Sequence, residues 1–158
     1  MVKTIALLIV PVVGLTIFVS ACSLFEDETR HTDPRVEVAI SATDSLVSPA
    51  HPTSLTVKAD NRGSSPVLLG RGSSSCQLAA VVQIGSQQYR VAELRPCTAD
   101  MVEQWLEPGE SLIERWEWDG RILRDHAGEL LPPGKYRAWG VAGKWTSRSA
   151  VEIEVIRE

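Results

Sequence analysis

The stretch ESLIERWEWD at residues 110–119 alternates apolar and polar side chains with a period of two. Leu112, Trp116 and Trp118 fall on one parity, and polar residues fill most of the other. Such alternation is typical of a β-strand with one buried face, because successive side chains point to opposite faces of a sheet. We therefore predict a strand whose tryptophans pack in the core. Glu114 falls on the same face, where a carboxylate needs a partner or a β-bulge.

The same alternation recurs in other short segments of the chain. Val36, Val38 and Ile40 share one parity, with the polar residue Glu37 between the first two. Further strands are predicted at 55–60, 76–84, 87–91, 135–143 and 150–157. Gly, Pro, Asn and Ser clusters separate these strands, and no helical period persists, although 99–106 and 121–131 are each compatible with a short helical turn. Short strands punctuated this way predict an all-β fold, an immunoglobulin-like antiparallel β-sandwich.

A tyrosine marks the start of one late strand. Tyr136 comes two residues after Gly134 in the segment LPPGKYRAWG, which is where a sandwich places its tyrosine corner. Two residues further on, where an antibody domain has its second core cysteine, this chain has Ala138. We predict a structural role for Tyr136, and a disulfide that joins different strands from the antibody pattern.

Two tryptophans near this strand are candidate contacts for a protein partner. If Tyr136 points inward, Arg137 and Trp139 fall on the outer face of the strand; coverage of the tryptophan by a loop is the alternative. Trp145 is expected near a loop tip, where aromatic residues often serve recognition, and packing over the end of the domain is the alternative. The candidate partner-binding residues are thus Trp145, Trp139 and Arg137.

The first residues have the pattern of a secretory signal. An apolar run at 5–19 follows Lys3, is interrupted by Pro and Gly, and ends in VSAC at 19–22. It is shorter than the roughly 20 apolar residues of a membrane-spanning helix. VSAC resembles the bacterial lipobox, which implies that cleavage leaves Cys22 as the first mature residue and that acyl chains modify it. An ordinary secretory signal with a chance cysteine is the alternative.

The chain divides into three parts under this interpretation. Residues 1–21 form a lipoprotein signal peptide, 22–35 the lipidated cysteine with a polar, mostly acidic tether, and 36–158 one folded domain. Two or more acyl chains make membrane anchoring stable. By analogy with lipoproteins, Ser23 in place of an aspartate favours the outer membrane, at its periplasmic face or at the cell surface, if the host has two membranes.

Cysteine use fits an exported domain. Setting Cys22 aside leaves Cys76 and Cys97, and Cys76 shares the apolar parity of its predicted strand. A pair of cysteines in an oxidising compartment is expected to form a disulfide, which stabilises a fold by about 3 kcal/mol for a loop of this length. Two free buried thiols are the alternative. The spacing and the lack of a paired histidine give little support for a zinc site.

Charge and motifs argue against several functions. Without Lys3 the mature chain has 15 basic and 20 acidic side chains, a formal charge of −5, which disfavours nucleic acid as a partner. The chain has no GxSxG elbow, HExxH helix, phosphate-binding GxxxxGK[ST] or calcium-loop pattern. Asp125 and His126 are interpreted as a solvated loop pair. We therefore predict no catalytic residue, no metal and no cofactor.

Three segments, taken in order, resemble the BsuPI domain family, which is named for an intracellular proteinase inhibitor of Bacillus. They are LTVKADNRGSSPVLL at 55–69, LEPGESLIERWEWDG at 106–120 and ELLPPGKYRAWGVAG at 129–143. The family pattern has an asparagine turn, a Pro-Gly-Glu entry to a strand ending in Trp-Asp, and a Pro-Pro-Gly-x-Tyr corner. Asn61, Trp118 and Tyr136 match these positions, so the resemblance implies structural roles for them. It covers about 55–143.

The resemblance and the signal together imply a noncatalytic cell-envelope lipoprotein whose immunoglobulin-like domain binds another protein. Proteinase inhibition is the specific form that the family suggests, with a protease as the partner. No reactive-site loop can be carried over, and export, lipidation and a disulfide depart from a cytoplasmic inhibitor. The alternative is a structural accessory of an envelope assembly without inhibitory activity. In either case the expected partners are the membrane, through the lipid anchor, and an unidentified protein.

Overall fold

The computed structural model describes residues 35–94, 97–124 and 127–157, and within these ranges the chain is all-β, with no helix. No helix of the described residues is long and apolar enough to cross a membrane. The predicted signal peptide, Cys22, the predicted tether at 22–35 except for Arg35, and Asp125 and His126 lie outside the described residues.

The strands are β1 (Val36–Ala42), β2 (Leu46–Val47), β3 (Thr53–Asn61), β4 (Val67–Gly72), β5 (Leu78–Ile84), β6 (Gln87–Arg90), β7 (Val102–Leu106), β8 (Ser111–Trp118), β9 (Arg121–Arg124), β10 (Ala127–Leu130), β11 (Gly134–Ala142), β12 (Trp145–Thr146) and β13 (Val151–Val155).

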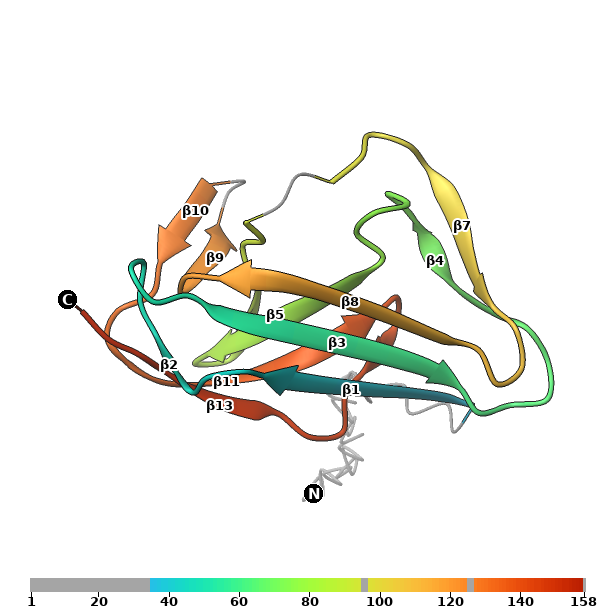
Figure 1. Cartoon of the computed structure of the whole chain (residues 1–158), viewed down its shortest axis with the longest axis horizontal. Coiled ribbons are helices and arrows are strands. Elements are labelled where there is room, and N and C mark those ends of the chain that lie inside the picture. Colours follow the sequence, from blue (N-terminus) through green and yellow to red (C-terminus); the bar gives the residue numbers. More distant parts are fainter. Residues whose placement is uncertain (1–34, 95–96, 125–126, 158) are drawn as a thin grey trace, which may run out of the picture.

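These strands form two larger sheets and two two-stranded sheets. One larger sheet has the order β1-β3-β8, and the other has the order β2-β13-β11-β5-β6 with β12 added to β11. All their pairings are antiparallel except that of β2 with β13. β4 pairs with β7, and β9 pairs with β10. In Figure 1, β1, β3 and β8 lie side by side, with β11 and β13 running beneath and behind them.

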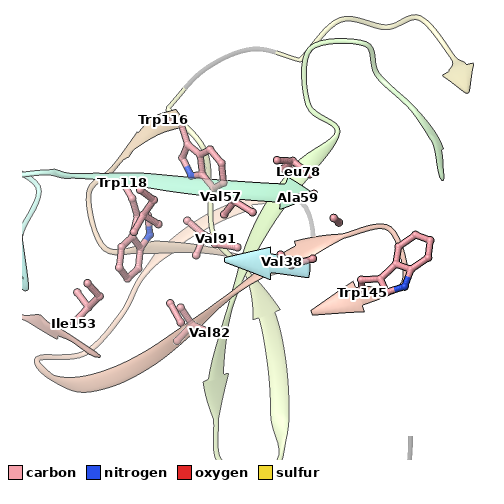
Figure 2. Close-up of a cluster of buried hydrophobic side chains, with 14 of the residues drawn as sticks. Val38, Val57, Ala59, Leu78, Val82, Val91, Trp116, Trp118, Trp145 and Ile153 are labelled. Carbon is pink, nitrogen blue, oxygen red and sulfur yellow. The ribbon is translucent and has the colours of Figure 1, made fainter. Parts of the chain in front are cut away.

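The core takes alternate residues from both larger sheets. The first sheet contributes buried side chains including Val38, Leu55, Val57, Ala59, Trp116 and Trp118, and the second contributes Leu78, Ala80, Val82, Ala138 and Ile153. Figure 2 shows Trp116 and Trp118 next to Val57 and Val91, with Trp145 on the other side of the cluster. The sheets approach closely at Gly140, where an added Cβ would lie 3.0 Å from Val57 Cγ1 and 3.2 Å from the carbonyl oxygen of Ala39.

The predicted strand at 110–119 is confirmed as β8; on its apolar parity Trp116 and Trp118 are buried, and Leu112 is half-buried. Trp118 is fully buried, and its indole N–H donates a hydrogen bond of 2.6 Å to the carbonyl of Arg121. The partner that Glu114 requires is the backbone N–H of Gln77, which donates to its carboxylate at 2.7 Å. This contact joins β8 to the residue just before β5, so a polar group on a mostly apolar face is satisfied by a distant segment.

The helical turns considered at 99–106 and 121–131 are wrong. The first segment contains β7, and the second contains β9 and β10. β7 pairs with β4 through residues about 35 positions apart, and β9 pairs with β10 across a short connection. Tertiary pairing of this kind overrides a weak local helical pattern.

Candidate functional site

The most distinctive region outside the core surrounds the disulfide. Cys76 and Cys97 are bonded, as predicted, with their Cα atoms 5.6 Å apart. The bond joins the residues between β4 and β5 to the segment that leads into β7. It therefore links one end of the β4–β7 ladder, where Gly72 pairs with Val102, to the segment that leads into β5 of the larger sheet.

A polar network reinforces the disulfide on its exposed side. The backbone N–H of Thr98 donates to Ser75 Oγ at 2.9 Å, and the backbone N–H of Ser74 donates to Asp100 Oδ1 at 3.2 Å. Hydrogen bonds from the side chains of Ser74 and Thr98 lower the pKa of Asp100 from 3.8 to about 2. Asp100 is therefore ionised and able to accept these bonds throughout the neutral and mildly acidic range.

A groove of about 390 Å³ lies beside the disulfide. Strands β4, β5, β6 and β11, residues next to β4, β5 and β11, and the two cysteines line the groove. The lining residues are Leu69, Gly70, Arg71, Gly72, Ser73, Cys76, Gln77, Ala79, Arg90, Cys97, Val141 and Gly143. Ala79 and Val141 are paired across β5 and β11. Their neighbours Leu78 and Ala142 are fully buried in the core, so by alternation Ala79 and Val141 lie on the opposite face of the sheet. The groove thus lies outside the main core.

Two glycines leave the wall of this groove open. A Cβ built at Gly70 or at Gly72 would meet no atom within 4 Å. The glycines alternate with Arg71 along β4, so they share one face of the strand. Just before them, the register with β7 shifts between Leu68 and Gly70, which places Leu69 in a bulge.

Two arginines border the groove, and carboxylates orient both. Arg71 pairs with Glu103 across the β4–β7 ladder, and Arg90 Nη2 lies 3.0 Å from Glu93 Oε1. The arginine side chains remain 71% and 45% exposed. Since a guanidinium has five N–H donors, each arginine keeps donors for a second acceptor.

The outer face of the β4–β7 pair carries exposed apolar side chains next to these charges. Met101 is 76% exposed and Trp105 is 47% exposed. The indole N–H of Trp105 donates to Glu103 Oε2 at 3.1 Å, which holds the ring beside the Arg71–Glu103 pair. Met101, Glu103 and Trp105 alternate along the chain, so they form one surface, which we call the hairpin face.

The tryptophans predicted as partner contacts are buried. Trp139 and Trp145 are each 3% exposed, so the expectation that their rings offer exposed contacts is corrected, and the covered alternative holds. The Arg137 guanidinium lies 5.2 Å from the centre of the Trp139 ring. Trp145 belongs to the core cluster because β12 turns back along β11, and Lys144 lies over its ring at 5.1 Å. Arg137 is exposed, but nothing brings these three residues to one open surface.

The hydroxyl of Tyr136 donates to the carbonyl of Pro132, four residues upstream, at 2.8 Å. Burial raises the pKa of the Tyr136 hydroxyl. Asn61, the last residue of β3, is fully buried. Neither Asn61 nor Tyr136, which lies in β11, belongs to the lining of the groove.

Sequence reasoning missed the groove and the hairpin face. Two signals were present: the glycines in LLGRG at 68–72, and the alternation of Met101, Glu103 and Trp105. Neither shows which strand pairs with which, so neither identifies the groove without the fold.

No family model matches the chain, and no curated protein matches it. Solved structures give distant likenesses. The alkylpurine DNA glycosylase AlkC of Pseudomonas fluorescens is 11% identical with a TM-score of 0.49, over 78% of this chain and 31% of that one. The β-glucosidase EmGH1 of Erythrobacter marinus is 19% identical with a TM-score of 0.44, over 77% and 15%. The CARDB domain of a Pyrococcus furiosus protein is 15% identical with a TM-score of 0.44, over 78% and 96%. At TM-scores below 0.5 these likenesses carry no argument about function.

Proposed function

We propose that this chain is a noncatalytic cell-envelope lipoprotein whose immunoglobulin-like β-sandwich binds another protein through the β4–β7 region. The observation that carries the proposal is the hairpin face, where exposed Met101 and Trp105 lie beside Arg71. Met, Trp and Arg are among the residue types enriched at protein interfaces. The contact is therefore assigned to this face in place of Trp139 and Trp145.

Three features support the sandwich assignment. The sheets β1-β3-β8 and β2-β13-β11-β5-β6 both contribute alternate side chains to one core. The hydrogen bond from Tyr136 to the backbone four residues upstream is the contact of a tyrosine corner. The sequence resemblance to the BsuPI domain at 55–143 implies the same class of fold. These arguments support the class of fold and leave the partner to experiment.

The envelope location is supported by two independent features. The Cys76–Cys97 disulfide suits an oxidising compartment, and VSAC at 19–22 resembles a lipobox. Mass spectrometry of the mature amino-terminal peptide checks the anchor. We expect Cys22 to carry acyl chains, and an unmodified Cys22 in protein purified from its own cells would refute the lipoprotein assignment.

Photo-crosslinking in cells that express the full-length chain tests the binding surface. A photoreactive phenylalanine analogue in place of Trp105 is compared with the same analogue in place of Leu46, which is 48% exposed and lies on β2. We expect one dominant protein adduct from position 105 and none from position 46. No protein adduct from position 105 would overturn the proposal.

Protease assays then separate the two forms of the function. If the crosslinked partner is a protease, purified full-length protein is titrated against its activity. Dose-dependent inhibition supports the proteinase inhibitor that the BsuPI resemblance suggests. Stable copurification without inhibition supports the alternative, a structural accessory of an envelope assembly.

A further inference from the structure

We propose that the groove beside the disulfide receives an extended segment of the protein partner, which adds as a strand along β4 and directs an acidic side chain toward Arg71 and Arg90. This inference rests on the proposed function and deepens it, because it names the part of the partner that is bound and the chemistry that recognises it.

The glycines of β4 give the first argument. Glycine inside a strand weakens the strand, and it often marks a place where a ligand or another backbone approaches closely. At Gly70 and Gly72, which line the groove, no atom of the residues that the structure describes occupies the room that the missing side chains leave. A main chain in extended conformation fits that room, since it needs to approach β4 without meeting side chains.

The pairing of β4 gives the second argument. Among the strands that the structure describes, β4 pairs with β7 alone, so its opposite edge has no strand partner. An unpaired edge presents a row of backbone donors and acceptors, and extended peptides bind such edges by adding a strand. The β4 backbone is held in place at Leu69, whose carbonyl packs against Gly143 of the turn between β11 and β12. This packing fixes the position of Leu69, directly before the segment of β4 that contains Gly70 and Gly72.

The lining of the groove gives the third argument, which concerns the side chains of the bound segment. Ala79, Val141 and the disulfide offer apolar contact at the base. Arg71 and Arg90 border the groove from β4 and β6, and each is oriented by a carboxylate while keeping further N–H donors. A carboxylate accepts charge-assisted hydrogen bonds from such donors. The fitting segment thus combines small apolar side chains with one Asp or Glu.

A library of linear heptapeptides displayed on phage tests the proposal with full-length protein in detergent micelles. We expect the selected peptides to contain Asp or Glu and to bind the protein with its own Gly70 and Gly72. Gly72→Val places a branched side chain in the open space and should weaken the selected peptides at least tenfold. The matched control is Ala39→Val, a similar enlargement at an exposed position of β1, which should leave affinity within twofold.

Gly72→Ala serves if the valine variant does not fold, because it adds one methyl group to the same space without a steric contact within 4 Å. Arg90→Gln should weaken acidic peptides and reduce the salt dependence of their binding, since one of the two cationic groups is removed. Equal affinity of the selected peptides for the glycine variants and for the unchanged protein would overturn the groove assignment, as would the selection of no peptide at all. Selection of peptides without acidic residues would overturn the assigned chemistry.

Crosslinking from position 105 distinguishes failure of this inference from failure of the proposed function. If the protein adduct persists at full yield in Gly72→Val, the partner binds the hairpin face but does not use the groove. Loss of the adduct in Gly72→Val, with retention in Ala39→Val, supports the groove.

Discussion

The side-chain amide of Asn61 donates a hydrogen bond to the backbone carbonyl of Leu106, 45 residues further along the chain, at 2.9 Å. The same amide donates to the carbonyl of Ser65 at 2.9 Å, and its oxygen accepts from the backbone N–H of Gly63 at 2.9 Å. One fully buried side chain thus ties the turn after β3 to the end of β7. These hydrogen bonds give Asn61 a structural role in the fold.

Replacing Asn61 with alanine should lower the free energy of unfolding by about 2–4 kcal/mol, because three hydrogen bonds are lost and buried backbone groups are left without partners. Urea denaturation measures the change. Gln88→Ala, at an exposed position of β6, is the control and should stay within about 0.5 kcal/mol. A loss for Asn61→Ala no greater than that of the control would contradict the assigned role.

Replacing both Cys76 and Cys97 with serine should lower the free energy of unfolding by about 3 kcal/mol. The disulfide closes a loop with a sequence separation of 21, and closure of a loop of that size restricts the unfolded chain. The measurement is urea denaturation with and without a thiol reductant. The reductant should bring the unchanged protein to the stability of the double variant and leave that variant unaffected; any other pattern argues against the bond.

Stability should fall in acid partly because of Asp60. Burial by itself raises the pKa of this carboxyl, but hydrogen bonds from Lys58 and Ser111 and the charges of Lys58 and Arg62 outweigh burial and hold the pKa below its ordinary value of 3.8. The stabilisation is therefore complete above that ordinary value and is lost as pH falls through the lower pKa of the folded state.

The test compares Asp60→Asn with the unchanged protein in urea denaturation between about pH 5 and pH 2. We expect the variant to lose less stability across this range. Glu117→Gln removes an exposed carboxylate from β8 and should leave the pH dependence of the unchanged protein intact. Identical acid profiles for Asp60→Asn and the unchanged protein would count against the Asp60 contribution.

Gly143→Ala should destabilise the protein by at least about 2 kcal/mol. Gly143 has a φ of +58°, and an added Cβ would lie 1.7 Å from the carbonyl oxygen of Leu69. Gly85 is the matched control, since its φ is +61° but its added Cβ would meet no atom within 4 Å. Gly85→Ala should therefore cost only the conformational strain, about 1 kcal/mol. Thermal and urea unfolding of both variants give the difference due to Leu69.

Tyr136→Phe should lower the free energy of unfolding by about 1 kcal/mol through loss of the hydrogen bond to Pro132. Tyr89→Phe removes a hydroxyl that donates to Gln87 at an exposed position, and it should change stability by less than about 0.5 kcal/mol. If both variants behave alike, Tyr136 does not stabilise its corner through the hydroxyl.

Sequence reasoning predicted the strands whose one face is buried. β8 and β1 alternate because Trp116, Trp118, Val36 and Val38 enter the core while their neighbours meet solvent. The disulfide was predictable from cysteine number and compartment. The strands follow from local periodicity and the disulfide from the number of cysteines. Neither prediction requires knowledge of which strands are neighbours.

The candidate site was not predictable for a physical reason. In β4, Gly70 and Gly72 have no side chains, so one face of the strand shows no alternation of apolar and polar residues. In β7, the apolar residue Trp105 is exposed, which is the opposite of what alternation predicts. Conversely, Trp139 lies on the face of β11 that points away from the core and is still buried. The position of the residues that cover it depends on the fold. Alternation with a period of two identifies the buried face of a strand only when the other face meets water. It therefore fails for a strand that is covered on both faces and for a strand whose apolar side chains are exposed.

The short strand β2 has a consequence for how the molecule loses its structure. The chain leaves β1 in one sheet, and β2 then pairs in parallel with β13 in the other before β3 returns to the first. The backbone N–H of Glu154 donates to the carbonyl of Ser45 at 2.7 Å, which secures this crossing. The two sheets cannot separate without loss of the pairing between β2 and β13. We therefore expect them to unfold together, as one cooperative unit.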